Sequence, residues 1–195
     1  MKVGLTGNYM SGVESPYLSK IYSNIGIPIF DADLMVKFLL FNNSETIIKI
    51  RKQFGNHVFT NLQVDLCKFP PLEFKKLLRV IELDLIKAYE RWRLQNINSA
   101  YTIFKSQILF EANWDKLMNY TICVFKPDSI RVSDISGIQQ IRLTEAYNII
   151  ENEMDIFQKN NLSNYVLHDY NSYNESLEEQ ILTINKKLFI KNPTM

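Results

Sequence analysis

Near the N-terminus, a loop with two glycines has residue types and spacing that could do chemistry. The run VGLTGNYMSGVES (residues 3–15) is a short apolar stretch that ends at Gly7, and Gly12 follows five positions later. In a phosphate-binding loop, glycines at this spacing let backbone N–H groups turn toward the phosphates. A lysine then reaches the terminal phosphates, and a Ser or Thr hydroxyl holds Mg²⁺. The spacing predicts a strand, a nucleotide-type loop that includes Ser11 as an extra donor, and a helix.

The charged parts of such a loop are missing. Val13 stands where the lysine belongs, and Glu14 stands where the hydroxyl belongs. A carboxylate can bind Mg²⁺, but beside a triphosphate with no lysine to offset it, the carboxylate of Glu14 repels more than it binds. Ser15 offers a hydroxyl one position late, and bulky Tyr9 and Met10 replace small residues. A plain strand-to-helix turn is the simpler interpretation for the present-day function.

Carboxylates at two other strand ends form a second group of candidates. The run IPIFDAD (residues 27–33) ends in Asp31 and Asp33, and Glu111 and Asp115 follow a later apolar run. A carboxylate at the carboxyl end of a parallel strand faces the ligand crevice and can act as a general base. Aspartates also commonly cap the helix that follows. Both interpretations stay open for these residues.

The elements that position these residues follow a strand–helix–strand pattern, which predicts an α/β fold with a parallel β-sheet flanked by helices. We expect a kinase-like core over residues 1–33 and 100–195 and a helical insertion over 34–99. The expected strands cover residues 2–6, 27–33, 100–110, 120–125 and 164–169. Outside the insertion, the expected helices cover residues 17–25, 143–157 and 175–190.

Composition excludes several classes of function. The net charge of +1 over 195 residues gives no strong attraction to nucleic acid or to acidic membranes. Cys67 and Cys123 lie far apart, and neither His57 nor His168 has a partner at ligand spacing, so no metal site is predicted. No apolar run reaches the roughly 20 residues that span a bilayer. With no secretion or transit signal, we expect an intracellular protein that is soluble or part of a complex.

Several runs together resemble dephospho-CoA kinase, the last enzyme of coenzyme A synthesis. They cover nearly the whole chain in the family's order: VGLTG with the later SG, GIPIFDAD (26–33), FGNHVF (54–59), QILFEANWDKLMNYTICVF (107–125), NYVLHD (164–169) and LEEQI (177–181). The resemblance implies a P-loop kinase fold with a helical CoA-binding insertion and a mobile lid. It also implies ATP and Mg²⁺ as cofactors, and Asp33 as the base that takes the proton of the ribose 3′-hydroxyl.

The departures from this family all remove positive charge or a family motif. Besides Val13 and Glu14, the family's His-Pro appears as Leu83-Asp84 or close by. Among the expected lid residues, Ile149 falls where an arginine is expected, Glu153 replaces a glutamine, and only Arg142 remains as a lid candidate. Phosphoryl transfer needs positive charge around the transferred group. We therefore predict a non-catalytic relative that needs no cofactor.

The predicted role is a structural or interaction subunit, with other protein subunits as partners. A ribonucleoprotein, a virion and a membrane-enzyme complex all remain possible as the assembly. One alternative is a diverged, active dephospho-CoA kinase with Asp33 as base and with Arg142 or Lys37 replacing the lost lysine. Another is a non-catalytic module that binds a nucleotide or CoA. A loop filled by Tyr9, Met10 or Glu14 would favour the structural role.

Overall fold

A computed structural model describes residues 1–61, 63–170 and 174–191. The chain divides into two compact units. The first comprises residues 1–30 and 97–195, and the second comprises residues 31–96.

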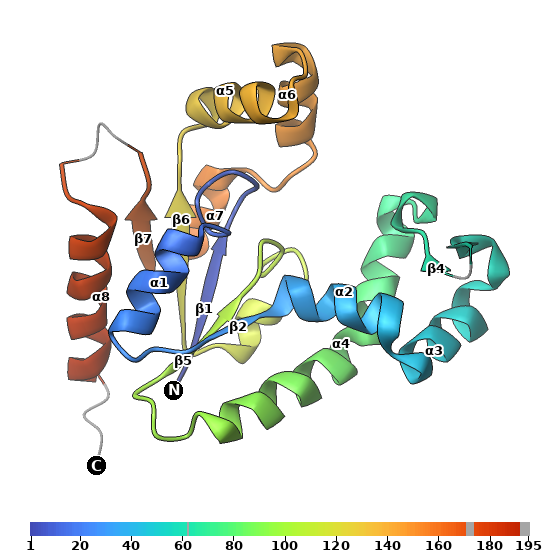
Figure 1. Cartoon of the computed structure of the whole chain (residues 1–195), viewed down its shortest axis with the longest axis horizontal. Coiled ribbons are helices and arrows are strands. Elements are labelled where there is room, and N and C mark those ends of the chain that lie inside the picture. Colours follow the sequence, from blue (N-terminus) through green and yellow to red (C-terminus); the bar gives the residue numbers. More distant parts are fainter. Residues whose placement is uncertain (62, 171–173, 192–195) are drawn as a thin grey trace. The chain divides into compact units, whose positions relative to one another are not determined.

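The first unit is built on a five-stranded parallel sheet in the order β2-β5-β1-β6-β7, as the α/β prediction required (Figure 1). Its central strands are continuous apolar runs because helices bury both faces of such a sheet. The carboxyl ends of parallel strands meet at one edge, where the loop after β1 emerges. The strands are β1 (Lys2–Gly7), β2 (Ile29–Asp31), β5 (Thr102–Lys105), β6 (Tyr120–Phe125) and β7 (Tyr165–His168).

Helices α1 (Pro16–Asn24) and α8 (Leu177–Lys191) pack against each other over a shared core. Ser15 caps the start of α1, and Pro16 occupies its first turn, where the missing N–H costs nothing. The core beneath these helices is formed by apolar side chains of the two helices and of the central strands, including Val3, Leu5, Leu18, Ile21, Ile103, Ile122, Val124, Ile181 and Leu188.

A pair of packed helices that we call the lid follows β6 (Figure 1). The lid comprises α5 (Asp128–Gln139) and α6 (Leu143–Glu151). The prediction of one helix over residues 143–157 was wrong. Helix α6 ends at Glu151, and a separate helix, α7 (Ile156–Leu162), begins after Asp155, whose side chain accepts the N–H of Phe157.

Two further sequence predictions need correction in the first unit. Helix α5 was not predicted, and it begins within the run KPDS (126–129). The strand expected over 100–110 covers only Thr102–Lys105. From Ser106 onward the chain turns, and the Ser106 hydroxyl accepts the N–H of Ile108. A 3-10 helix, η3 (Trp114–Leu117), then buries Trp114 against Phe104.

The second unit is mainly helical and was predicted as such, apart from a short hairpin. Asn43 caps α3 by accepting the N–H of Thr46. Asp84 of α4 accepts hydrogen bonds from Thr46 and Lys49 of α3, which ties the two helices together. The elements are α2 (Ala32–Asn42), α3 (Ser44–Phe54), η1 (Asn56–Val58), β3 (Phe59–Thr60), β4 (Gln63–Val64), η2 (Leu66–Lys68) and α4 (Pro71–Gln95).

Among the described residues, none of the helices combines the length and the apolar character that a membrane crossing requires.

Candidate phosphate-loop site

The loop between β1 and α1 keeps the backbone that its glycines predict. Gly12 has φ of 100°, in the left-handed region that favours glycine, and a Cβ there would overlap the carboxylate of Asp169. A Cβ on Gly7 would overlap the hydroxyl of Ser11. The N–H of Ser11 donates to the Asn8 carbonyl at 3.0 Å. The strand, the tight loop and the helix therefore follow one another as in a phosphate-binding loop.

Val13 and Glu14, which stand in place of the lysine and the hydroxyl residue, point to different parts of the structure. Val13 is buried in the core between the sheet and α1. Glu14 turns back into the loop, where its Oε1 accepts the N–H of Met10 at 2.7 Å. Its Oε2 is buried and has no hydrogen-bond partner among the described residues. The hydroxyl of Ser15 accepts the N–H of Tyr17 at 3.2 Å, so it caps α1.

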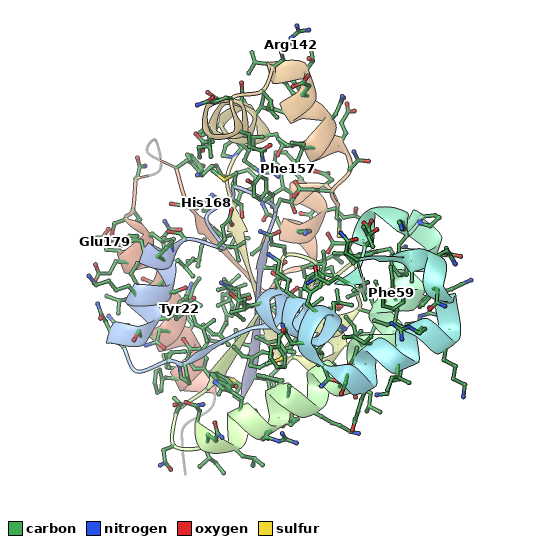
Figure 2. The ribbon with its side chains drawn as sticks, turned by 45° about the vertical axis from the view of Figure 1, so that its right-hand side comes forward. Tyr22, Phe59, Arg142, Phe157, His168 and Glu179 are labelled. Carbon is green, nitrogen blue, oxygen red and sulfur yellow. The ribbon has the colours of Figure 1, made fainter. Side chains whose placement is uncertain are left out.

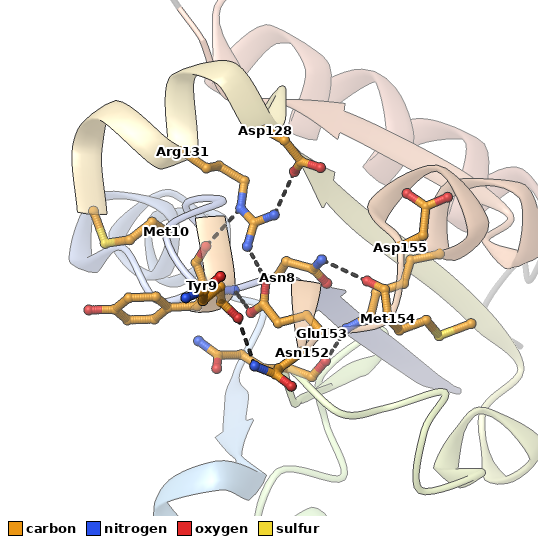
Figure 3. A network of polar contacts seen from close by, with 12 residues as sticks. Asn8, Tyr9, Met10, Asp128, Arg131, Asn152, Glu153, Met154 and Asp155 are labelled. Atoms are coloured by element: carbon orange, nitrogen blue, oxygen red, sulfur yellow. Dashed lines mark hydrogen bonds and ion pairs between the residues drawn. The ribbon is translucent and has the colours of Figure 1, made fainter. Parts of the chain in front are cut away.

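A second carboxylate enters the loop from the segment that follows the lid (Figure 3). Glu153 Oε1 accepts the N–H of Tyr9 at 2.7 Å. The guanidinium of Arg131, which is fully buried, forms an ion pair with Glu153 and donates from Nε to the Tyr9 carbonyl at 2.8 Å. Its Nη1 also contacts Asp128 at 2.6 Å. The backbone N–H and carbonyl groups of Tyr9 are thus both bonded to side chains of this chain.

The side chains of Tyr9 and Met10 lie against the lid. They pack on a buried cluster formed by Val132, Ile135 and Ala146. The Tyr9 hydroxyl also accepts a hydrogen bond from the amide of Gln139 at 3.1 Å. Tyr9 and Met10, which we expected to fill the loop if its role is structural, therefore pack on the lid.

Asp169 adds negative charge on the other side of the loop, next to Gly12. Burial raises the pKa of its carboxyl group, the nearby Lys126 lowers it, and Asp134 raises it again. Lys126 is itself paired with Asp134 at 3.3 Å. The surroundings of the loop therefore disfavour an additional anion.

The two aspartates at the junction of β2 and α2 have different positions, Asp31 at the end of the strand and Asp33 in the helix. Asp31 caps α2 by accepting the N–H of Leu34 at 2.9 Å, as the capping interpretation predicted. Asp33 lies in the first turn of α2, and Lys37 lies further along the same helix. The role of Asp33 as a base, and that of Lys37 as a replacement cation, stay predictions.

Glu111 is held by a residue that the sequence did not single out. The ammonium group of Lys159 in α7, almost fully buried, lies 2.8 Å from Glu111 Oε1 and 2.5 Å from the carbonyl oxygen of Gln107. This pairing offsets the charge of Glu111, which the sequence offered as a candidate for the substrate side of the ligand crevice. A lysine buried just before a helix end has no local sequence signal, because its partner is far away in the chain.

Arg142 lies at the start of α6, exposed at the tip of the lid (Figure 2). Its backbone N–H donates to Glu145 at 3.2 Å. Arg131, rather than Arg142, is the lid arginine that contacts the loop.

The residues present do not fit a bound nucleotide with its magnesium ion. The Tyr9 N–H is bonded to Glu153, and the Met10 N–H is bonded to Glu14. The residue directly after Gly12 is Val13 and not a lysine.

The family model and the curated relatives that match this chain indicate one family. The family model described as dephospho-CoA kinase matches residues 1–175. The dephospho-CoA kinase of Clostridium perfringens is 24% identical over 183 residues, covering 86% of this chain and 87% of that protein. Among solved structures, TT1252 from Thermus thermophilus superposes with a TM-score of 0.76 at 19% identity, covering 96% of each chain. The dephospho-CoA kinase from Campylobacter jejuni superposes with a TM-score of 0.53 at 14% identity, with the same coverage. At these identities, the structural matches establish the fold.

Proposed function

The chain belongs to the dephospho-CoA kinase family, and we propose that it is a non-catalytic member of that family. The observation that carries this proposal is the occupation of the loop by the chain's own carboxylates. Glu14 bonds to the N–H of Met10, and Glu153 bonds to the N–H of Tyr9. A phosphate would have to displace both carboxylates to reach these groups.

Electrostatics supports the same conclusion. Phosphoryl transfer depends on positioning and on positive charge around the transferred group. One cation beside the loop, Arg131, is already bonded to Asp128, Glu153 and the Tyr9 carbonyl. Each lost charge-assisted contact to a phosphate costs about 1.5–3 kcal/mol. The lysine of the loop and a lid arginine, whose positions hold Val13 and Ile149, would make two such contacts. Their loss weakens binding by roughly two to four orders of magnitude.

We propose a structural or interaction role for this member, with other protein subunits as partners. The support is a preserved five-stranded core beside a loop that serves packing. The lid also leaves large apolar side chains exposed, among them Ile138, Leu143 and Tyr147. A fold does not dictate function, so the argument rests on the loop.

A second candidate is a diverged dephospho-CoA kinase that uses ATP and Mg²⁺ with Asp33 as base. The match of the family model to residues 1–175, nearly the whole chain, favours it. A non-catalytic module that binds CoA or a nucleotide away from the loop is a third, because the occupied loop excludes only phosphates bound in it. Each candidate predicts a different binding and turnover result.

The test is calorimetry with ATP–Mg²⁺ on the wild type and on Val13→Lys/Glu14→Ser, with Glu153→Gln added in a third protein. We expect no binding to the wild type and micromolar binding once the lysine and hydroxyl are restored and the carboxylate of Glu153 is neutralised. Ile48→Lys/Glu45→Ser on α3 is the matched control, because it makes the same charge change at exposed positions.

Micromolar binding of ATP to the wild type would overturn the proposal. Turnover with dephospho-CoA that is lost in Asp33→Asn would then establish the kinase. Binding of CoA without turnover would favour the non-catalytic binding module.

A further inference from the structure

The lid contacts the phosphate loop through both polar and apolar groups. From these contacts we infer that the loop is a fixed connector that holds the lid in place without any nucleotide. The inference rests on the proposed function, since it assigns the loop a structural task in place of phosphate binding. We call the residues that form the polar part of this connection, Tyr9, Arg131 and Glu153, the latch.

In the latch, both backbone polar groups of Tyr9 are bonded to side chains. Glu153 accepts the Tyr9 N–H at 2.7 Å, and Arg131 Nε donates to the Tyr9 carbonyl at 2.8 Å. Arg131 and Glu153 are paired with each other, which closes a ring of contacts (Figure 3). Bonds that involve an ionised donor or acceptor are roughly twice as strong as neutral ones. The loop tip therefore has one well-determined position relative to the lid.

Both ends of the lid meet at this loop. Arg131 belongs to the first turns of α5, where the chain leaves β6. Glu153 and Met154 belong to the segment between α6 and α7, and the Met154 carbonyl accepts the side-chain N–H of Asn8 at 2.8 Å. A hinged lid moves at the segments where it joins the core. Here the loop bonds to residues at both of these segments.

Apolar packing reinforces the polar contacts. Tyr9 and Met10 cover Val132, Ile135 and Ala146, which form the inner surface of the lid. Opening the lid would expose this surface to water and would break the bond of the fully buried Arg131 guanidinium to the Tyr9 carbonyl. Small side chains at positions 9 and 10 would not make these apolar contacts. Tyr9 and Met10, which replace the small residues of a phosphate loop, are thus the residues that pack against the lid.

In mobile-lid enzymes, contacts with the bound substrate draw the lid closed. Here the chain supplies contacts to the lid from its own loop. A ligand shifts an equilibrium only by its differential affinity for the two states. The position of this lid is therefore independent of ATP.

The test is hydrogen exchange, followed by mass spectrometry, on the full chain with and without ATP–Mg²⁺ and with sodium triphosphate. We expect the amides of residues 8–10, 131–136 and 145–151 in the wild type to be protected, and equally so in all three conditions. Glu153→Gln and Arg131→Met should speed their exchange by about tenfold or more, because each removes charge-assisted bonds. Glu151→Gln and Arg142→Met are the matched controls at exposed positions, and they should change nothing there.

Protection of residues 181–188 in α8 reports whether each variant is folded. If Arg131→Met loses that protection, the nearly isosteric Glu153→Gln carries the test. A lid that exchanges freely in the wild type, or that becomes protected only with ATP, would overturn the latch. So would a folded Glu153→Gln protein with unchanged exchange.

Calorimetry separates the latch from the proposed function. ATP binding by a wild type whose lid is protected beforehand would refute the non-catalytic proposal and leave the latch standing. Absence of ATP binding together with an unprotected lid would refute the latch alone.

Discussion

At the residue scale, the carboxylate of Glu14 contacts a backbone donor of its own loop. A hydroxyl at this position would leave the Met10 N–H available, whereas the longer carboxylate side chain reaches it at 2.7 Å. The negative charge satisfies a backbone donor that a phosphate oxygen would otherwise satisfy. The carboxylate of Glu14 thus lies inside the loop, bonded to one of the loop's own backbone donors.

Gly12 is the loop residue whose replacement we expect to cost most. Alanine at φ of 100° is strained, and its Cβ would overlap the Asp169 carboxylate. We expect Gly12→Ala to lower the free energy of unfolding by about 1–3 kcal/mol, measured by urea denaturation. Gly137→Ala is the control, since Gly137 lies within α5 with open space around it. It should stabilise by about 0.5–1 kcal/mol. An unchanged stability of Gly12→Ala would contradict the loop geometry.

Asp169 predicts a pH dependence of stability. Burial raises the pKa of its carboxyl group in the folded state, so the unfolded chain releases the proton first as pH rises. Its contribution to stability is therefore full below the unfolded pKa of about 3.9 and is lost as pH rises through the folded value. Asp169→Asn should be at least as stable as the wild type at pH 7 and should lose that advantage near pH 4. Urea denaturation at both values checks this, and a variant that is less stable only at pH 7 would refute it.

At the scale of elements, an ion pair that involves a buried lysine connects α7 to the segment that follows β5. Lys159 contacts Glu111 and the Gln107 carbonyl from an almost fully buried position. Removing one partner of such a pair leaves the other uncompensated, which costs about 3–5 kcal/mol when both are buried. Since Glu111 is about a quarter exposed, we expect Lys159→Met to cost near 3 kcal/mol in urea denaturation.

The double variant Lys159→Met/Glu111→Gln tests whether the pair is the cause. Its loss in free energy of unfolding should be smaller than the sum of the losses in the two single variants, because the double variant leaves no charge of the pair without its partner. Additive costs would mean that Lys159 stabilises α7 by packing and not through Glu111.

The order of the main elements could be predicted from the sequence, whereas several bounds and the first helix of the lid could not. Strands buried on both faces are apolar runs, so β1 and β6 were evident. Helix α5 holds three serines and Gly137, and its few buried positions give no clear period. The break after Glu151 contains neither proline nor glycine, so a single helix was expected.

The candidate site could be predicted only in its local parts. The glycine frame of the loop and the capping by Asp31 follow from short-range patterns. The contacts of Tyr9 with Arg131 and Glu153 join residues 122 and 144 positions apart. No local pattern encodes such pairs, because they depend on how the lid folds back over the loop.

At the scale of the whole molecule, each compact unit has its own polar ties. The latch lies within the first unit, and the contacts of Asp84 with Thr46 and Lys49 lie within residues 31–96. Burial raises the pKa of Asp84, but hydrogen bonds from Lys49 and Thr46 more than offset this and hold it below its ordinary value. The ionised form is therefore favoured in the folded state. This stabilisation is present above the unfolded pKa of about 3.9 and is lost as pH falls through the folded value.

Asp84→Asn should accordingly weaken one unit and spare the other. Because Lys49 is nearly half exposed, we expect a loss of no more than about 1 kcal/mol at pH 7. Hydrogen exchange should quicken in α3 and α4, while the amides of the latch and of α8 keep their wild-type rates. Glu82→Gln on the same helix, which removes one acidic charge at another position, is the control and should leave both units unchanged. Faster exchange in the latch of Asp84→Asn would mean that the two units open together. The lid would then depend on residues 31–96 as well as on its own loop.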